Sequence, residues 1–429
     1  MQTRIAPQYR TDPSVHEAET ILRDCVHCGF CNATCPTYRL LGDEQDGPRG
    51  RIYLIKALLA GERATERTRL HLDRCLGCRA CETTCPSGVR YGRLLEIGRH
   101  LQNAQLPRPP RAALERRLLR YVVTEPRRFR AALGVGQALR PLLRGSLARS
   151  FPPLPAKSSH AASSVSTTHA RRVLHLDGCV QSVATPETRT ALARVLDRLE
   201  VALVSAPAAG CCGALSAHLD ALDEAKALMR RNIDAWWPYL EEGAEAVLVS
   251  ASGCGSIVKD YGYYLQDDPT YANKAKRVAE LTYDPSEWLA RELAARPTIG
   301  NAQGRIAFHA PCSLQHGQKL GGVVEGILTR LGYQLSVIRD AELCCGSAGS
   351  YSLLQPQLAT QLRRQKLACL QADRPQCIAT ANVGCQLYLA QEAVVPVLHW
   401  LELVDEALAK TSVPGNLGEG SLKADHPPK

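Results

Sequence analysis

One twelve-residue pattern occurs twice near the amino terminus and constrains the fold more than any other feature of the chain. Its first copy runs from Cys25 to Pro36 and its second from Cys75 to Pro86, and both follow the spacing C-x2-C-x2-C-x3-C-P. We expect each loop to wrap its three closely spaced thiols around one face of a metal centre. The fourth thiol, held apart by three residues and followed by a proline turn, is expected to project away from that centre.

This spacing is the one that bacterial ferredoxins use for cubane iron–sulfur clusters, in which the fourth Cys of each run ligates the other cluster. The same crossing assigns one [4Fe–4S] cluster to Cys25, Cys28, Cys31 and Cys85. It assigns the second [4Fe–4S] cluster to Cys75, Cys78, Cys81 and Cys35. Two zinc sites or a disulfide framework are the alternatives. A zinc site needs only two C-x2-C pairs. It does not require the third Cys or the C-P ending of each run.

Length and cysteine usage narrow the class of protein. At 429 residues the chain is long enough for two to four domains, each with its own core. Its 18 Cys are too sparse for a small disulfide scaffold, and their grouping predicts metal ligation in a reducing cytosol. No apolar run reaches about 18 residues, and residues 1–19 show neither an apolar signal core nor a twin-Arg pair. We therefore expect a cytoplasmic protein.

The net charge of +10 is unevenly distributed. Residues 106–150 hold 11 Arg against Glu115 and Glu125, so the basic excess is local, and no nucleic-acid partner is expected. Residues 106–170 read as a linker: two amphipathic stretches, 114–122 and 139–147, precede a tract rich in Pro, Ser and Thr. Basic amphipathic helices bind anionic membranes or partners, here through Arg116, Arg117 and Arg120. A solvated helix packed on its own protein is the alternative.

Apolar residues at helical spacing flank both Cys loops, for example at 52–59 and 94–101. This pattern predicts an all-α ferredoxin domain rather than the small β-rich type. Arg49 and Arg51 follow the first loop. They would either offset the negative charge of a thiolate-bound cluster or be solvated at the surface.

From residue 171 the chain repeats itself, with one Cys, a C-C-G triplet after 31 intervening residues, and then a G-C pair. The first copy has Cys179, Cys211, Cys212 and Cys254, and the second has Cys312, Cys344, Cys345 and Cys385. A short apolar run precedes each of these Cys elements, and helical patterns lie between the runs. The pattern predicts βαβαβ units with parallel strands. The strands are expected at 173–176, 201–205, 247–250, 306–308, 333–338 and 378–381.

Open parallel sheets bind ligands at the carboxyl ends of their strands, where the four Cys of each copy are expected to converge. Each set is compatible with a cubane cluster, a zinc ion or no ligand, and inert buried thiols are the alternative. Cys369 and Cys377 have no counterpart in the first copy and are expected to be inert. His175 and His309 lie just before their Cys elements, where packing explains each as well as function does.

The duplicated C-C-G module resembles the cysteine-rich domain of heterodisulfide reductases and of several respiratory dehydrogenase subunits. With the two-cluster domain in front, the chain resembles the iron–sulfur subunits of bacterial glycolate oxidases, most closely over Cys25–Arg51. One departure concerns the C-x2-C that ends each heterodisulfide-reductase module, where five Cys hold a non-cubane cluster. Ala251 and Asn382 replace the leading Cys of these pairs. The departure speaks against that cluster and against disulfide cleavage.

The resemblance implies the electron-transfer subunit of an oxidoreductase complex, with no catalytic residue on this chain. Separate flavin-binding subunits would oxidise glycolate to glyoxylate, and this chain would pass the electrons to a respiratory acceptor, expected to be a quinone. No G-x-G-x-x-G opens a helix after a strand, so neither flavin nor NAD is expected on it. The alternatives are the iron–sulfur subunit of anaerobic glycerol-3-phosphate dehydrogenase, a thiol–disulfide enzyme and a zinc-bound scaffold.

The predicted fold is multidomain: an all-α ferredoxin domain with two [4Fe–4S] clusters, followed by two pseudo-symmetric α/β repeats with parallel sheets. The expected boundaries are 10–105 for the ferredoxin domain, 106–170 for the linker, 171–300 and 301–410 for the repeats, and 411–429 for a flexible tail. The expected location is the cytoplasm, with peripheral contact to the cytoplasmic face of the inner membrane through the linker.

Overall fold

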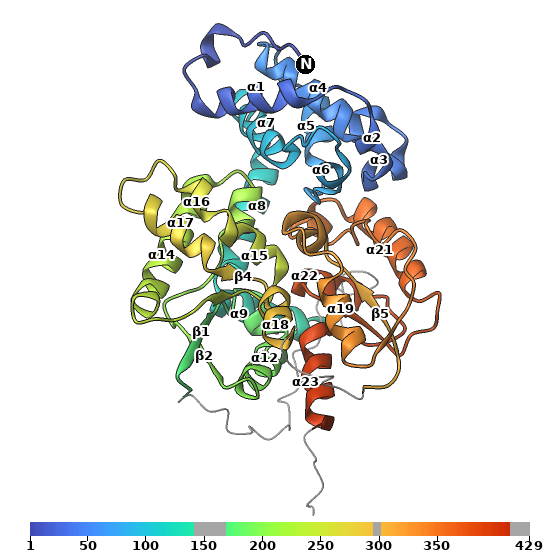
Figure 1. Cartoon of the computed structure of the whole chain (residues 1–429). Coiled ribbons are helices and arrows are strands. Elements are labelled where there is room, and N and C mark those ends of the chain that lie inside the picture. Colours follow the sequence, from blue (N-terminus) through green and yellow to red (C-terminus); the bar gives the residue numbers. More distant parts are fainter. Residues whose placement is uncertain (141–168, 295–301, 412–429) are drawn as a thin grey trace, which may run out of the picture.

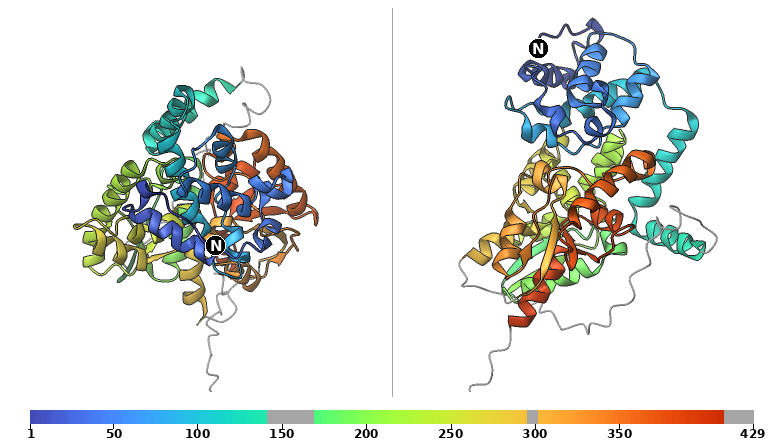
Figure 2. Two further views of the ribbon diagram at one scale, coloured as in Figure 1. Left: turned by 90° about the horizontal axis from the view of Figure 1, so that it is seen from above. Right: turned by 90° about the vertical axis from the view of Figure 1, so that its right-hand side faces the viewer.

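The computed structural model of the chain describes residues 1–140, 169–294 and 302–411. The amino-terminal helices form one body, and two α/β units lie side by side beneath it (Figure 1). Figure 2 shows from the side that helix α8 runs from the first body down along the second. The predicted fold class, an all-α domain followed by two α/β repeats with parallel sheets, is confirmed.

The described residues before 141 form helices and loops, without a strand. Proline begins α1, α3 and α4, at a position where its missing N–H group has no partner to lose. Helices α4 and α7 pack closely because Gly98 leaves room for Ile55; a Cβ at Gly98 would lie 2.5 Å from Ile55 Cγ1. The elements are η1 (Pro7–Tyr9), α1 (Pro13–Asp24), α2 (Phe30–Ala33), α3 (Pro36–Leu41), η2 (Glu44–Asp46), α4 (Pro48–Leu59), α5 (Glu66–Asp73), α6 (Ala80–Thr84), α7 (Tyr91–Gln105), α8 (Pro110–Val123) and α9 (Pro126–Ala138).

The first repeat is a four-stranded sheet in the order β2-β1-β3-β4, and every pair of neighbouring strands is parallel. Its strands are β1 (Arg171–His175), β2 (Val201–Ser205), β3 (Val247–Leu248) and β4 (Thr282–Tyr283). Its helices are α11 (Gln181–Ala184), α12 (Glu187–Asp197), α13 (Ala214–His218), α14 (Leu222–Glu241), α15 (Ser252–Lys259), α16 (Tyr261–Tyr264), α17 (Ala272–Glu280) and α18 (Pro285–Ala294).

The second repeat has the same strand order, β6-β5-β7-β8, and is again parallel throughout. Its strands are β5 (Arg305–His309), β6 (Gln334–Leu335), β7 (Cys377–Thr380) and β8 (Val397–His399). Its helical elements are the π-helical turn η4 (Ser313–Gly317) and helices α19 (Val323–Arg330), α20 (Tyr351–Leu354), α21 (Pro356–Leu370), α22 (Val383–Leu389) and α23 (Trp400–Thr411). The six predicted strands are present, and each sheet has a fourth strand, β4 or β8, that the sequence did not predict.

The two repeats share one hydrophobic core. The last helix of each repeat packs on the first long helix of the other, α23 on α12 and α18 on α19. Trp288 and Trp400, one from each repeat, belong to the same buried cluster. Asp405 on α23 pairs with Arg194 on α12 and lies 2.7 Å from Arg198, the residue that caps the carboxyl end of α12. Because each repeat packs its last helix on the other in the same way, the pair of repeats resembles a two-fold symmetric dimer.

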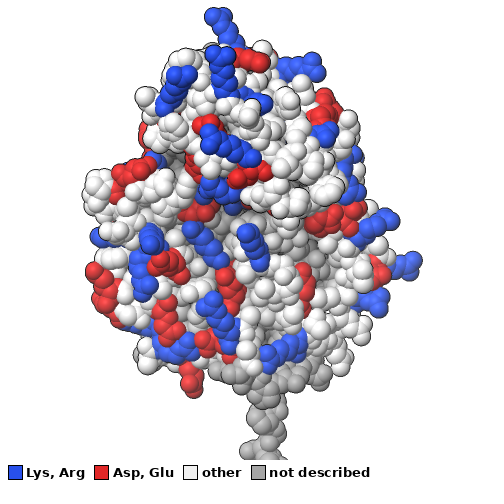
Figure 3. Space-filling view, turned by 45° about the horizontal axis from the view of Figure 1, so that its top comes forward, with Lys and Arg blue, Asp and Glu red and all other residues white. Residues whose placement is uncertain are grey.

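Lys and Arg alternate with Asp and Glu over the face that the amino-terminal domain and the repeats form together (Figure 3). The net positive charge of the chain is therefore not concentrated on this face. A polyanion is attracted by a surface of one charge sign, and this face is mixed.

Candidate metal centres

Two residues with left-handed backbone conformation shape each Cys loop of the amino-terminal domain. They are His27 (φ 61°) and Gly29 (φ 87°) in the first loop, and Gly77 (φ 65°) and Arg79 (φ 62°) in the second. The two positions are equivalent in the two loops, so both loops bend in the same way. Helices α2 and α6 begin directly after them and pack against each other.

The first cavity between these loops is lined by Cys25, Cys28, Cys31 and Cys85. Cys85 comes from the second motif, so the structure brings it to the three closely spaced thiols of the first. Burial and the neighbouring Cys25 thiol raise the pKa of Cys31 to about 11. A thiol with that pKa stays protonated at neutral pH unless a metal replaces its proton.

The second cavity is lined by Cys35, Cys75, Cys78 and Cys81. Cys81 also borders the first cavity, but its electrostatic neighbours are Cys78, Cys75 and Cys35, so it belongs with the second set. Burial raises the pKa of Cys78 and of Cys81 well above the usual value of a thiol. The structure thus groups the eight thiols four and four, with Cys35 and Cys85 exchanged.

The spacing of these thiols fits a cluster better than a single ion. Zinc, with Zn–S bonds of about 2.3 Å, draws tetrahedral sulfur ligands to within roughly 3.8 Å of one another. Among the described residues, two groups of three His, Cys, Asp or Glu bring their ligand atoms within 4.8 Å of one another, and neither contains a Cys of the two loops. Three loop thiols thus do not gather as closely as one zinc ion would draw them, and this wider spacing fits a four-iron cluster better.

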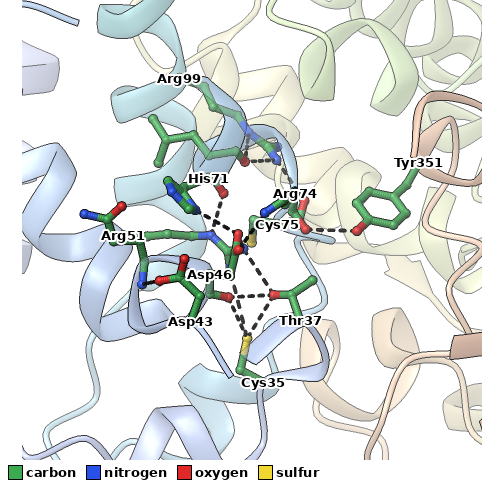
Figure 4. Close-up of polar contacts among 12 residues, drawn as sticks. Cys35, Thr37, Asp43, Asp46, Arg51, His71, Arg74, Cys75, Arg99 and Tyr351 are labelled. Carbon is green, nitrogen blue, oxygen red and sulfur yellow. Dashed lines mark hydrogen bonds and ion pairs between the residues drawn. The ribbon is translucent and has the colours of Figure 1, made fainter. Parts of the chain in front are cut away.

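Arg51 is fully buried beside the second cavity (Figure 4). Its Nε donates to the carbonyl oxygen of His71 at 2.7 Å, and its Nη2 donates to Thr37 Oγ1 at 3.1 Å. Its Nη1 lies 3.9 Å from Cys35 Sγ. The sequence left open whether Arg51 would be solvated or would face a cluster, and its burial excludes the solvated alternative.

Asp46 is the acidic partner of this cation and is also fully buried. Its Oδ1 lies 3.4 Å from Arg51 Nη2, and its Oδ2 lies 2.8 Å from Arg74 Nη1. Burial disfavours the charge of Arg51, but Cys75, Tyr91, Cys35 and Asp46 outweigh it and raise the pKa of Arg51. One carboxylate is thus shared between two guanidinium groups, which leaves positive charge directed at the thiols.

Cys75 is the thiol most affected by this charge. Burial opposes its ionisation, but Arg51 and Arg99 outweigh burial and lower the pKa of Cys75. Arg99 is fixed by the carbonyl oxygens of Leu72 and Cys75, both 2.8 Å from its Nη2 (Figure 4). The Tyr91 hydroxyl donates to Cys75 Sγ at 3.6 Å. The surroundings of Cys75 therefore favour the thiolate that a metal ligand must be.

Repeat 2 covers the second cavity, a contact that the sequence did not predict. The Tyr351 hydroxyl donates to the carbonyl oxygen of Arg74 at 3.1 Å, next to Cys75 (Figure 4). The thiols of Cys312 and Cys344 act electrostatically on Cys78.

The first cavity lies at the surface instead. Its Cys28 is exposed, and so are the adjacent side chains of Val26 (69%) and Phe30 (63%).

In repeat 1 the four predicted Cys converge at the carboxyl ends of the strands. Hydrogen bonds between thiols join Cys179 to Cys211, Cys211 to Cys212, and Cys212 to Cys254. The preceding His175 is fully engaged, because its Nδ1 lies 2.9 Å from Asp177 Oδ1 and its Nε2 lies 3.0 Å from Ser250 Oγ.

In repeat 2 the four equivalent Cys also converge. Cys312 Sγ and Cys344 Sγ are 3.9 Å apart, and Cys345 is hydrogen-bonded to Cys344 and Cys385. The ligand atoms of His309, Cys345 and Cys385 all lie within 4.8 Å of one another. Cys369 and Cys377 lie in α21 and β7 and belong to neither group of close ligand atoms.

The two positions that lack the expected Cys lie where the repeats meet. The Ser252 N–H donates to the carbonyl oxygen of Ala381 at 3.1 Å, and the Gly253 N–H donates to Asn382 Oδ1 at 3.2 Å. Asn382 Nδ2 in turn donates to Cys385 Sγ at 3.5 Å. The Asn382 amide thus connects the two repeats and contacts Cys385. It occupies the position at which the heterodisulfide-reductase module has its fifth Cys.

Two of the three linker Arg predicted to contact a membrane or partner form ion pairs within the chain, as the alternative of a helix packed on its own protein would have it. Arg116 pairs with Asp73 of α5 at 3.2 Å, and Arg120 pairs with Glu224 of α14 at 3.0 Å. Helix α8 therefore connects the amino-terminal domain to repeat 1. Most of the stretch expected at 139–147 lies outside the described residues. None of the described helices is long and apolar enough to cross a membrane.

Comparison with protein families assigns both parts of the chain. Residues 21–89 match the family described as a 4Fe-4S dicluster domain. Residues 173–259 and 306–390 each match the family described as a cysteine-rich domain.

Relatives of known description cover nearly the whole chain. It is 51% identical over 410 residues to the glycolate oxidase iron-sulfur subunit of Escherichia coli (strain K12), which covers 96% of this chain and 100% of that protein. It is 28% identical to the probable glycolate oxidase iron-sulfur subunit of Bacillus subtilis (strain 168), over 86% of this chain and 88% of that protein. Lactate utilization protein A of Bacillus velezensis is 25% identical, over 53% of this chain and 96% of that protein.

Identity of 51% over nearly the full length of both chains extends through the two-cluster domain and both cysteine-rich repeats. The architecture, the grouping of the eight loop thiols and this sequence identity all indicate the same protein family. The chain belongs to the family of glycolate oxidase iron–sulfur subunits, electron-transfer components of an oxidoreductase complex that contain [4Fe–4S] clusters.

Proposed function

We propose that this chain accepts electrons from flavin-binding subunits that oxidise glycolate to glyoxylate and passes them to a quinone. The observation that supports this best is the position of the two four-thiol cavities, one at an exposed surface and one against repeat 2. The clusters supply one-electron redox chemistry when bound. The protein contributes the ligands and the charges that set their potentials.

The first cluster is assigned to Cys25, Cys28, Cys31 and Cys85, and the second to Cys75, Cys78, Cys81 and Cys35. The lining of the two cavities supports this assignment. Arg51 and Arg99 act on the second set, and they favour the added negative charge of its reduced state.

The surface over the first cavity is the proposed docking site of the flavin-binding subunit. Val26, Phe30 and Tyr53 are 69%, 63% and 55% exposed and lie around the exposed Cys28 loop. Large apolar side chains at a surface mark sites where a partner binds. Docking here would bring a flavin near the thiols that are least covered by protein.

The outer side of α8 is the proposed contact with the membrane that holds the quinone. Leu114, Leu118 and Tyr121 are spaced at four and three residues, so they share one face of the helix, and they are 66%, 57% and 61% exposed. The apolar side chains of this face carry the proposal, because Arg116 and Arg120 form ion pairs within the protein.

The crossed ligand assignment is tested with single serine variants. Cys85→Ser should remove the EPR signal of the cluster that Cys25→Ser also removes, because both thiols line the first cavity. Cys35→Ser should instead affect the cluster that Cys75→Ser removes. Loss of the same signal in Cys85→Ser and Cys35→Ser would contradict the crossing.

The electron-transfer role is tested by stopped-flow absorbance of the reconstituted complex. Cys28→Ser or Cys78→Ser should abolish glycolate-dependent reduction of a quinone analogue, while glycolate still bleaches the flavin on the partner subunits. The isolated chain should oxidise no glycolate. Oxidation by the isolated chain, or activity with glycerol 3-phosphate but not with glycolate, would overturn the proposal.

The docking surface is tested by the double variant Phe30→Ala/Tyr53→Ala. Its affinity for the flavin-binding subunits should fall by roughly 10-fold or more, as expected when central aromatic contacts are lost. Iron content and EPR signals should not change, which separates docking from cluster assembly. Val394→Ser is the control, since Val394 is 82% exposed and lies in repeat 2. An equal loss of affinity in the double variant and in Val394→Ser would refute this docking site.

Membrane contact is tested by flotation with anionic liposomes. The double variant Leu114→Ser/Leu118→Ser should bind about 10-fold more weakly, because each substitution removes apolar area from the face that would insert into the membrane. Leu353→Ser is the matched control, since Leu353 is 52% exposed on α20. If wild-type protein stays with the unbound fraction at every salt concentration, α8 is not a membrane contact.

A further inference from the structure

We propose that repeat 2 binds one zinc ion through His309 Nε2 and the thiols of Cys345 and Cys385, and that repeat 1 has no such site. The inference concerns only the contacts within the repeats. It does not depend on the direction of electron transfer proposed above.

The first support is an imidazole nitrogen that lacks a partner. His309 is 2% exposed, and within the described part of the chain no hydrogen bond reaches its Nε2. Buried polar atoms in folded proteins are almost always bonded, so an unpaired one in a native structure needs an explanation. A metal ion on Nε2 is such an explanation, because neutral imidazole is a common zinc ligand.

The second support is the distance between the donors. One ring nitrogen of His309 and the Sγ atoms of Cys345 and Cys385 lie within 4.8 Å of one another. Zinc bonds of about 2.0 Å to nitrogen and 2.3 Å to sulfur require donors that are roughly 3.5–3.8 Å apart. Small side-chain movements reach that spacing. Cys344, which is hydrogen-bonded to Cys345, is available as a fourth ligand.

The surroundings of the three donors suit thiolate ligands. Asn382 Nδ2 donates to Cys385 Sγ at 3.5 Å, and the Gly346 N–H donates to Cys344 Sγ at 3.4 Å. The buried Lys366 interacts electrostatically with Cys344 and Cys345. Its Nζ is fixed by the carbonyl oxygen of Asp340 at 2.6 Å. Such outer contacts orient metal ligands and offset the negative charge of the thiolates.

Repeat 1 provides an internal comparison. The equivalent His175 is bonded at both ring nitrogens, to Asp177 and Ser250, so neither is free for a metal. Ala251 stands where repeat 2 has Asn382, and it offers no side-chain donor to Cys254. The two repeats share a fold, a Cys pattern and this His, but they differ in the bonding of the His and in the residue at position 251 or 382.

The other compact group of candidate ligands, Asp43, Asp46 and His71, does not carry the same inference. Asp46 is already neutralised by Arg51 and Arg74, whose guanidinium groups would repel a cation. In the His309 group the nearby cation is Lys366, whose Nζ is fixed by the carbonyl oxygen of Asp340 and whose charge the thiolates of Cys344 and Cys345 would offset.

The test measures metals bound to the full-length chain. Protein with intact clusters is dialysed against zinc and washed with a weak chelator, and iron and zinc are counted on the same sample. We expect one zinc per chain in addition to the iron of the clusters. Cobalt(II) added in place of zinc should give the intense visible bands of a tetrahedral thiolate site.

Five variants test the ligands and their surroundings. His309→Gln and Cys385→Ser should lose the zinc and the cobalt bands, whereas their repeat 1 counterparts, His175→Gln and Cys254→Ser, should keep them. Asn382→Ala should weaken zinc binding by roughly 10–100-fold, as the loss of an outer contact does. Unchanged iron content and circular dichroism confirm that each variant is folded.

Three results would overturn the proposal. The first is wild-type protein that binds no zinc and gives no tetrahedral cobalt spectrum. The second is unchanged zinc affinity in folded His309→Gln. The third is four further irons per chain that are lost in Cys385→Ser, which would identify a cluster in repeat 2 in place of a single ion.

Discussion

The buried charge of Arg51 is the interaction on which the amino-terminal domain most depends. A guanidinium with no exposed surface is costly unless anions surround it, and its carboxylate partner Asp46 is shared with Arg74. The remaining compensation comes from the thiol groups of Cys35 and Cys75. These groups supply negative charge only as thiolates, the form that a metal stabilises. Folding of this domain and assembly of its second cluster are therefore one linked equilibrium.

The same charge makes the two cavities unequal although their loops have the same shape. Arg51 and Arg99 act on the second set of thiols, which repeat 2 covers, while the first set lies under an exposed apolar surface. Positive charge near a cluster stabilises its reduced state, and solvent exposure changes its potential as well. A duplicated motif has thus become two different sites through residues that lie outside the motif.

Spacing and local pattern predicted much of this structure, and contacts between distant residues account for what they missed. The eight loop Cys, six of the eight strands that the structure describes and the convergence of the C-C-G thiols follow from sequence-local rules. No apolar run marks strand β4 (Thr282–Tyr283), and Pro396 interrupts the apolar run that leads into β8. The sequence predicted a membrane or partner contact for Arg116, because its partner Asp73 is 43 residues away and leaves no local signal. Asn382 read only as a missing Cys, since its bond to Gly253 crosses between repeats.

Donor spacing separates the kinds of metal site in this chain more clearly than residue type does. Cys occurs in all of them, but the loop thiols stand apart around two cavities, whereas His309, Cys345 and Cys385 gather within 4.8 Å. A cluster places its ligands around several irons, and a single ion draws them to one point. The imidazole adds a second distinction, because the loop sets contain thiols alone. Side-chain geometry before any metal binds therefore already favours clusters in the amino-terminal domain and one ion in repeat 2.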